Sequence, residues 1–340
     1  MPSSANWDVP LLFAHRSGII FQKSAGSYGA ESRQMMKAVV VHKYGGPEEL
    51  KFEEFPDPAP GAGEVLVRIA ATSINPFDIM RRSGAARDAA PIKFPGVVGV
   101  DLSGRILEVG PGVSGFAVGD QVFAMADETY AELCVVKGSS LAKIPVGLDL
   151  IEAAALPLVT TTGNQLISVG TGIQSGQTVL VTGAVGNVGR SAVFTAKDRG
   201  AVVIAGVLKR QVQEAASLGA DQIVATDDEK SMANLPELDA VADAVGGKTA
   251  EKLIVKVKRG GVFASVLGAP QNAKDFPSVK VVPVYASPDA KILLYMAQAV
   301  EAGKLKIPIG RKLPLKDAEQ GHATVAKGGA GKLLLVVDKE

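Results

Sequence analysis

Three glycines, spaced three residues apart, stand between an apolar strand and a helix in the middle of the chain. Val179-Leu-Val-Thr leads into the glycines, and a helix-compatible run, 190–198, and a β-rich run, 201–207, follow. Glycine permits a tight turn and close backbone approach to a pyrophosphate, and a helix N-terminus offers free N–H groups. A glycine-rich turn used only for packing is the alternative. We expect a dinucleotide site at Gly183, Ala184, Val185, Gly186, Asn187, Val188 and Gly189.

The end of the next predicted strand indicates which dinucleotide binds. An NAD site places an acid about 20 residues past the glycines, where it binds the ribose hydroxyls. No acid stands there in this chain, since the strand ends Gly206-Val-Leu-Lys209-Arg210 and Asp198 falls earlier, at a helix end. Arg binds a phosphate bidentately and Lys acts as a point charge, so this pair favours the 2′-phosphate of NADPH. The alternative is a solvated helix start.

Composition limits the remaining classes of function. The 340 residues include 36 Lys plus Arg against 35 Asp plus Glu, a formal charge of +1, and this balance does not suggest a nucleic-acid or membrane partner. Apolar residues make up 47%, enough for a sizeable core, yet none of their runs has the length of a membrane span. We therefore expect a cytoplasmic enzyme with a small-molecule substrate.

Few residues are available to bind a metal. The chain holds one cysteine, Cys134, and three histidines, His15, His42 and His322. Structural zinc needs about four ligands and catalytic zinc about three, chiefly Cys and His. We predict surface or packing roles for the last two histidines and a core position for Cys134, because no base is identified beside the thiol. The prediction is a metal-free site.

The elements that position these residues change character along the chain. From Met36 to about 157, short β segments such as 64–70, 97–109 and 121–125 are broken by Gly and Pro, which indicates an antiparallel, barrel-like unit. From about 158 to 285, strands alternate with helices, which predicts a parallel sheet with right-handed crossovers. The strand candidates there are 177–181, 201–207, 222–225, 239–244, 261–267 and 279–284. A helix, 289–302, and a strand, 332–338, end the chain. The fold class is α/β, with a cleft between the two units.

Residues 1–35 differ in composition from the rest. They hold Ser, Gly and Ala with scattered basic residues, and no long apolar stretch. This composition argues against a secretory signal. We interpret the segment as a flexible extension, with an organellar presequence or a start upstream of a natural one at Met35 or Met36 as the alternatives. A strand-like run, 37–43, follows it.

Several short blocks follow one another in order along the chain. The blocks are Asn75-Pro-Phe-Asp78, Arg82-Ser-Gly84, Pro95-Gly-Val-Val-Gly-Val-Asp101-Leu-Ser-Gly104, Gly119-Asp-Gln-Val122, Thr129-Tyr-Ala-Glu132, Ala153-Ala-Ala-Leu-Pro157, the glycine turn, Asp243-Ala-Val-Gly246 and Gly331-Lys-Leu-Leu334. Each block alone is unspecific, but the ordered set resembles the zinc-free quinone oxidoreductase branch of the medium-chain dehydrogenase/reductase superfamily, over about 36–338. Zinc-dependent relatives have Gly-His-Glu where this chain has Gly99-Val100-Asp101, so Val100 replaces a ligand.

The resemblance implies a domain plan and a reaction. It implies a GroES-like catalytic domain of residues 36–157 and 286–340, and a Rossmann NADPH-binding domain of residues 158–285. The implied reaction is NADPH-dependent reduction of quinones or activated alkenes without zinc. It also implies a homodimer formed by edge-strand pairing, for which 279–284 is the apolar strand we nominate.

The resemblance also implies roles for single residues. Asn75, Asp78 and Thr162 are the catalytic candidates: the Asn75 amide as a donor to substrate or cofactor, Asp78 as an orienting or capping group, and Thr162 beside the nicotinamide. A turn residue before Pro76 is the alternative for Asn75, and the run Thr160-Thr-Thr162 leaves the threonine register open by one. The further cofactor contacts that the blocks imply are Val245, Val266, Leu267 and Lys332.

Two departures leave the substrate open. Some relatives carry an active-site tyrosine where this chain has Met80, and often an aromatic residue where it has Asn164; Tyr130 we interpret as packing. The final proton is then expected from water. A reductase of quinones or α,β-unsaturated carbonyls is the first hypothesis. The alternatives are an enoyl-thioester reductase, which Met80 disfavours, and an inactive NADPH-binding scaffold or sensor.

Overall fold

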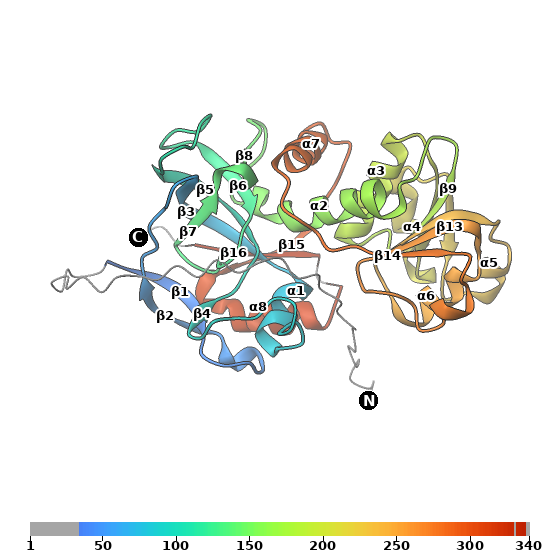
Figure 1. The fold of residues 1–340 in the computed structure, drawn as a ribbon, viewed down its shortest axis with the longest axis horizontal. Coiled ribbons are helices and arrows are strands. Elements are labelled where there is room, and N and C mark those ends of the chain that lie inside the picture. Colours follow the sequence, from blue (N-terminus) through green and yellow to red (C-terminus); the bar gives the residue numbers. More distant parts are fainter. Residues whose placement is uncertain (1–33, 330, 338–340) are drawn as a thin grey trace.

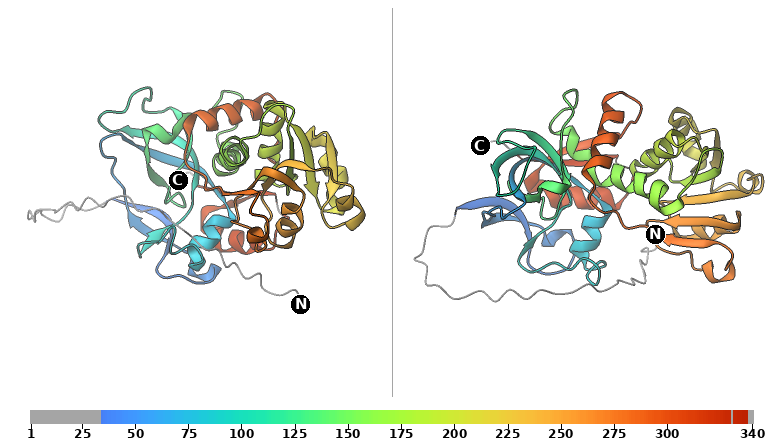
Figure 2. Two further views of the ribbon diagram at one scale, coloured as in Figure 1. Left: turned by 45° about the vertical axis from the view of Figure 1, so that its right-hand side comes forward. Right: turned by 45° about the horizontal axis from the view of Figure 1, so that its top comes forward.

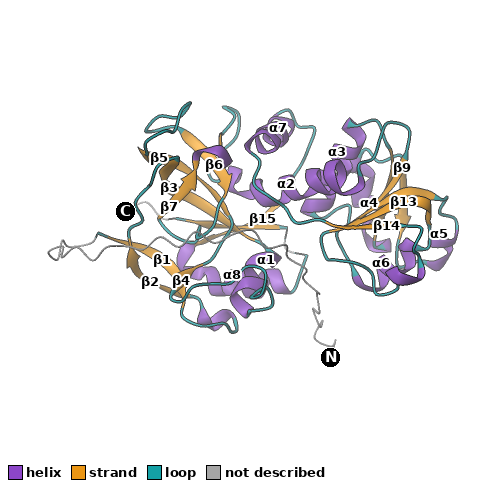
Figure 3. Cartoon of the chain, in the orientation of Figure 1, coloured by secondary structure: helices purple, strands orange, loops and turns teal. Residues whose placement is uncertain are grey.

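The computed structural model describes residues 34–329 and 331–337. Two lobes lie side by side along the long axis of the molecule (Figure 1). One is dominated by strands and the other alternates strands with helices (Figure 3). The predicted extension, 1–35, lies outside the described residues except for its last two.

The β-rich lobe contains a seven-stranded sheet of order β15-β16-β3-β5-β6-β8, with β7 on β3, and a three-stranded sheet of order β2-β1-β4. The C-terminal strand β16 pairs antiparallel with β3 and so brings the end of the chain into this lobe. The elements are β1 (Met35–Val41), β2 (Lys51–Pro56), β3 (Glu64–Ile74), α1 (Pro76–Ser83), β4 (Gly96–Val97), β5 (Asp101–Val109), β6 (Gln121–Met125), β7 (Leu133–Lys137), β8 (Leu141–Lys143), β15 (Ile309–Pro314), α8 (Ala318–Ala326) and β16 (Lys332–Val336).

The second lobe is a six-stranded parallel sheet of order β11-β10-β9-β12-β13-β14. Val179 and Val181 of β9 join one apolar core and Leu180 joins another, because successive side chains point to opposite, helix-covered faces. The predicted dimerisation strand, β14, lies at one edge of this sheet. The elements are β9 (Thr178–Thr182), α3 (Asn187–Asp198), β10 (Val202–Val207), α4 (Val212–Ala215), β11 (Gln222–Ala225), α5 (Glu229–Ala233), β12 (Leu238–Asp243), α6 (Gly247–Ile254), β13 (Val257–Ser265) and β14 (Lys280–Pro283).

Two helices lie between the lobes, α2 (Pro157–Gln165) and α7 (Ala290–Glu301) (Figures 1 and 2). A π-helical turn, Leu166–Thr171, extends α2 towards the parallel sheet. At one end of α7, Glu301 accepts the Gly147 N–H over 2.8 Å, and nearer its middle the Tyr295 hydroxyl donates to Asp198 over 2.6 Å. Helix α7 therefore forms hydrogen bonds both with a loop of the first lobe and with α3 of the second lobe.

Several element boundaries differ from the sequence prediction. Strand β1 already begins at Met35, which pairs with Pro56, and α3 begins at Asn187 rather than at 190. Strand β13 starts at Val257, four residues before the predicted 261. The predicted strand 97–109 is broken into β4 and β5 because Gly99 has φ of 100°, where a Cβ would lie 2.3 Å from the Tyr130 ring.

Candidate active site

The glycine turn closes tightly onto the first turn of α3. Gly183 has φ of 59°, and its carbonyl accepts the Gly186 N–H over 2.8 Å. A Cβ on Gly189 would lie 2.1 Å from the Gly183 carbonyl oxygen, so only glycine lets helix and turn approach this closely. Gly186 caps α3, a helix of 12 residues whose first N–H groups lack intrahelical acceptors. The turn therefore has the shape and the donors that a pyrophosphate needs.

The carboxyl ends of the neighbouring strands meet this turn. A Cβ on Gly183 would lie 2.9 Å from Val245, and one on Gly246 would lie 3.0 Å from Leu267. The segment with Val245 follows β12, and Val266 and Leu267 follow β13. The structure thus brings the predicted residues Val245 and Leu267 together with the glycine turn. This edge of a parallel sheet is where such folds bind dinucleotides.

Asp243, which the sequence analysis did not single out, organises this edge. Its buried carboxylate accepts the Thr182 hydroxyl over 2.8 Å and the Ser265 hydroxyl over 2.7 Å. It also accepts the backbone N–H groups of Val245 and Gly246 over 3.2 and 3.1 Å. One carboxylate therefore ties together the ends of β9, β12 and β13.

The predicted 2′-phosphate pair lies just past β10, the strand beside β9. The Lys209 ammonium donates to Asp228 over 3.2 Å, and the Lys209 backbone N–H donates to Asp227 over 2.7 Å. The Arg210 side chain is exposed and forms no ion pair within residues 34–337 as described. Of the two cations, Arg210 is thus the one whose charge a carboxylate does not offset.

Helix α2 carries Thr162 to the start of α3. Gly163, the next residue, packs so closely that a Cβ there would lie 2.5 Å from the Val188 carbonyl and from Ser191. Thr162 is 8% exposed, and no hydrogen bond of its hydroxyl is found in the part of the chain that the structure describes. The helix that carries the predicted threonine therefore packs, through the next residue, against the start of α3.

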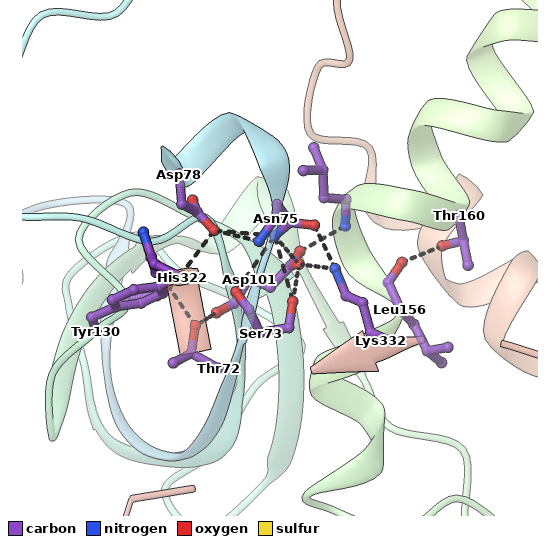
Figure 4. A network of polar contacts seen from close by, with 12 residues as sticks. Thr72, Ser73, Asn75, Asp78, Asp101, Tyr130, Leu156, Thr160, His322 and Lys332 are labelled. Atoms are coloured by element: carbon purple, nitrogen blue, oxygen red, sulfur yellow. Dashed lines mark hydrogen bonds and ion pairs between the residues drawn. The ribbon is translucent and has the colours of Figure 1, made fainter. Parts of the chain in front are cut away.

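The first turn of α2 is held on the other side by a buried polar network centred on Asp101 (Figure 4). Asp101 Oδ1 accepts the Leu158 N–H over 2.7 Å. Oδ2 accepts the Asn75 amide over 2.8 Å and the Lys332 ammonium over 3.3 Å, and also the Ser73 hydroxyl. Lys332 donates as well to Asn75 Oδ1. Three segments distant in sequence therefore meet at one carboxylate.

This network includes the Asn75 amide, the predicted donor to substrate or cofactor. Asn75 is 1% exposed, its Nδ2 donates to Asp101, and further acceptors lie on Asp78 and Ser73 at 3.4–3.5 Å. An amide nitrogen has two hydrogens, and protein acceptors occupy both directions. Direct donation from Asn75 to a substrate oxygen is therefore not supported by this geometry.

Lys332, which is predicted to contact the cofactor, belongs to the same network. It is 2% exposed and contacts Asn75 and Asp101 in the β-rich lobe, whereas the glycine turn lies in the other lobe. Strand β16 carries it there by pairing with β3.

Asp78 performs the capping role predicted for it and also has an unusual pKa. Its carboxylate accepts the Asn75 N–H over 2.8 Å at the start of α1. Burial, with the charge of Asp101 added, raises the pKa of Asp78 from 3.8 to about 7, although the Asn75 N–H bond, Lys332 and Tyr130 act in the opposite direction. The Tyr130 hydroxyl donates to the same carboxylate. Tyr130 is thus both the packed aromatic ring that we predicted and a polar partner.

His322 is fully buried on α8, which agrees with the packing alternative of its predicted surface or packing role. Its Nε2 lies 3.1 Å from the Tyr130 hydroxyl. Cys134 lies in the core of the β-rich lobe, as predicted, and burial raises the pKa of its thiol. Within residues 34–329 and 331–337, His, Cys, Asp and Glu form no group of three that could hold a metal ion.

Two family models match the chain. Residues 61–148 match the alcohol dehydrogenase GroES-like domain, and residues 218–335 match the zinc-binding dehydrogenase domain. The E. coli quinone oxidoreductase, solved in complex with NADPH, superposes with a TM-score of 0.78 at 26% identity, covering 88% of this chain and 99% of that one. The predicted α/β class, with GroES-like and Rossmann-like units, is thereby confirmed.

Three relatives match most of the chain. The chloroplast envelope quinone oxidoreductase homolog of Arabidopsis thaliana is 31% identical over 89% of this chain and 98% of its own. The NADPH-dependent alkenal/one oxidoreductase of the same plant is 30% identical over 85% of this chain and 78% of its own. The acryloyl-coenzyme A reductase of Sulfurisphaera tokodaii is 28% identical over 88% and 99%.

Proposed function

The chain belongs to the quinone oxidoreductase family of medium-chain dehydrogenases/reductases, and from this premise we propose that it reduces quinones or α,β-unsaturated carbonyl compounds with NADPH. One observation carries the proposal. Helix α2 packs through Gly163 beside the glycine turn and begins on the Asp101 carboxylate, so it joins a dinucleotide-type turn to a buried polar cluster. An oxidoreductase of this kind needs its cofactor and its polarising groups on one rigid element.

The residues of the parallel sheet fit the cofactor. Residues 183–189 would hold the pyrophosphate, Val245, Val266 and Leu267 would line its path, and Arg210 with Lys209 would pair with the 2′-phosphate. When bound, NADPH supplies the hydride. The preference for NADPH over NADH rests on the two cations and on the absence of an acid at the end of β10.

Among the three catalytic candidates, we assign contact with the substrate to Thr162. Reduction places negative charge on the carbonyl oxygen, and a hydrogen-bond donor aimed there lowers the barrier. The Asn75 amide already donates to Asp101, and Asp78 caps α1, whereas the Thr162 hydroxyl has no competing partner in the described residues. Asn75 and Asp78 are then supporting residues, and the proton that completes the reduction comes from water.

An enoyl-thioester reductase is the second candidate, since a relative of similar length is named as an acryloyl-coenzyme A reductase. NADPH consumption measured with a simple quinone, an enone and an enoyl-coenzyme A thioester distinguishes the two. We propose turnover with the first two and slower turnover with the thioester. Faster turnover of the thioester would favour the second candidate, and binding of NADPH without turnover would favour a scaffold or sensor.

The zinc-free reaction, the homodimer and the cytoplasmic location stay proposals. Strand β14 supports pairing of two copies, because it is an edge strand of the parallel sheet. Within the described part of the chain, none of the helices combines the length and apolar character needed to span a bilayer. The domain division at 158 and 285 is likewise proposed, and it is supported by the parallel sheet being separate from the two sheets of the β-rich lobe.

A further inference from the structure

We infer that Asp101 is a positioning residue: its single buried carboxylate fixes both the orientation of the Asn75 amide and the first turn of the helix that carries Thr162. The inference deepens the proposed function and rests on it for the role of Thr162. Asp101 touches neither glycine turn nor Thr162 in the structure, so it acts through its neighbours.

Charge fixes which way the Asn75 amide points. A lysine ammonium can only donate and a carboxylate can only accept. Lys332 donates to Asn75 Oδ1 while Asp101 Oδ2 accepts from Nδ2, so a rotated amide would face two like partners. Asp101 and Lys332 are 0% and 3% exposed at their side chains, and this burial strengthens the preference.

The second oxygen of Asp101 acts on the interdomain helix. Oδ1 accepts the Leu158 N–H over 2.7 Å in the first turn of α2, where a carboxylate also interacts favourably with the helix dipole. Thr162 lies one turn further along, and Gly163 packs on α3. A shift of the Asp101 carboxylate would therefore displace α2 relative to the β-rich lobe.

A single substitution at Asp101 or at Lys332 would not separate an effect on positioning from an effect on stability. An uncompensated buried charge is strongly destabilising, whereas replacing both partners of a buried pair is often neutral. The informative variant is thus the double change Asp101→Asn with Lys332→Met, which removes both charges and keeps similar volumes. It also removes the two charged groups that fix the orientation of the Asn75 amide.

Asp239 and Lys258 provide a matched control. Asp239 also accepts a backbone N–H, that of Thr178, over 2.8 Å, and it pairs with Lys258. It lies at the amino end of β12, opposite the end that carries Asp243. Asp239→Asn with Lys258→Met therefore removes a second, more exposed ion pair away from the site.

The experiment compares thermal stability, kcat and amide hydrogen exchange of residues 157–165 in the full chain. For the double variant at 101 and 332 we expect parent-like stability and kcat lower by about 10- to 100-fold. We also expect faster exchange in the first turn of α2, because a neutral amide oxygen accepts the Leu158 N–H less strongly than a carboxylate does. The control should keep parent-like kcat and exchange in α2. Parent-like kcat and exchange in the site variant would overturn the inference, as would equal losses in the control.

Two further provisions distinguish failure of this inference from misfolding of the variant and from failure of the proposed function. If the site double variant does not fold, Asp101→Glu keeps the charge and moves the carboxylate by one methylene. We then expect the same loss of kcat and faster exchange of α2, and parent-like values of both would contradict the inference. If the parent consumes no NADPH with any acceptor, the proposed function fails, and exchange of α2 alone decides on Asp101.

Discussion

The Tyr130 hydroxyl donates a hydrogen bond to the Asp78 carboxylate over 3.1 Å, and both side chains are fully buried. Because its proton points to Asp78, the same oxygen must accept from His322 Nε2 at 3.1 Å. Nδ1 of His322 is then a bare acceptor, consistent with its having no partner in the described residues. Burial, aided by Arg82, lowers the pKa of His322 to about 3, so the ring is neutral near neutral pH.

Asp78 is expected to make the fold less stable as pH rises from about 4 to about 7. The folded protein keeps the Asp78 proton up to about pH 7, whereas the unfolded chain loses it near 3.8, so the unfolded state binds fewer protons in this window. The free energy of unfolding falls accordingly, by about 4 kcal/mol at most. The groups that face Asp78 are Asn75, Asp101, Tyr130 and Lys332.

Asp78→Asn tests this pH dependence, because the amide oxygen still accepts the Asn75 N–H but does not titrate. Urea unfolding of parent and variant should show the parent losing stability relative to the variant between about pH 4 and about pH 8. Parallel curves for the two proteins would show that Asp78 has an ordinary pKa.

Thr162→Val is expected to lower kcat by about 10- to 100-fold, since it removes one donor to the developing charge while preserving shape. Thr161→Val is the matched control: the Thr161 hydroxyl is buried and has no hydrogen-bond partner among the described residues, so its removal should leave kcat unchanged. Steady-state kinetics on both variants also decides the threonine register that the sequence leaves open. A loss confined to the Thr161 variant would move the assignment by one residue.

Gly186→Val should weaken NADPH binding at least about tenfold, or about 1.4 kcal/mol. A Cβ there lies 3.1 Å from the Gly183 carbonyl, which folding tolerates with a small shift, but the branched side chain stands where phosphate must approach. Gly61→Val, where a Cβ lies 3.2 Å from Glu64, controls for the general effect of adding a side chain. Fluorescence titration measures the affinity. Unchanged affinity in the folded Gly186 variant would show that this turn does not bind the pyrophosphate.

Removal of the Lys209 and Arg210 side chains should weaken NADPH by roughly 10- to 150-fold, because a charge-assisted hydrogen bond contributes about 1.5–3 kcal/mol. NADH, which lacks the 2′-phosphate, should be little affected. Arg210→Ala should account for more of the loss than Lys209→Ala, since Lys209 is paired with Asp228. Titrations with both cofactors measure these affinities. Equal losses for NADPH and NADH would show that Lys209 and Arg210 do not bind the 2′-phosphate.

The elements of the fold could be predicted from local patterns, whereas the polar network could not. Glycine spacing and apolar runs indicate β9, the turn and α3 within a few residues, because turns and strands are local. The ion pair between Asp101 and Lys332 spans 231 residues and depends on β16 pairing with β3, which periodicity does not reveal. The signal available for Asp101 was its place in the block Gly99-Val100-Asp101, which does not reveal its partners.

His322 and Asp243 illustrate the same limit. Each is a polar residue beside apolar neighbours. Only the structure shows that His322 has Tyr130 as its hydrogen-bond partner, and that Asp243 accepts the hydroxyls of Thr182 and Ser265. For Asn75 the sequence predicts a site residue, but it does not reveal that the amide donates to Asp101.

The most direct measurement of the central proposal is NADPH oxidation by the purified full chain, with a simple quinone and with an enone as acceptors. The account predicts stoichiometric oxidation with at least one of them, a lower rate with NADH, and no loss of activity after treatment with a chelator. Tight binding of NADPH without oxidation by either acceptor would contradict it.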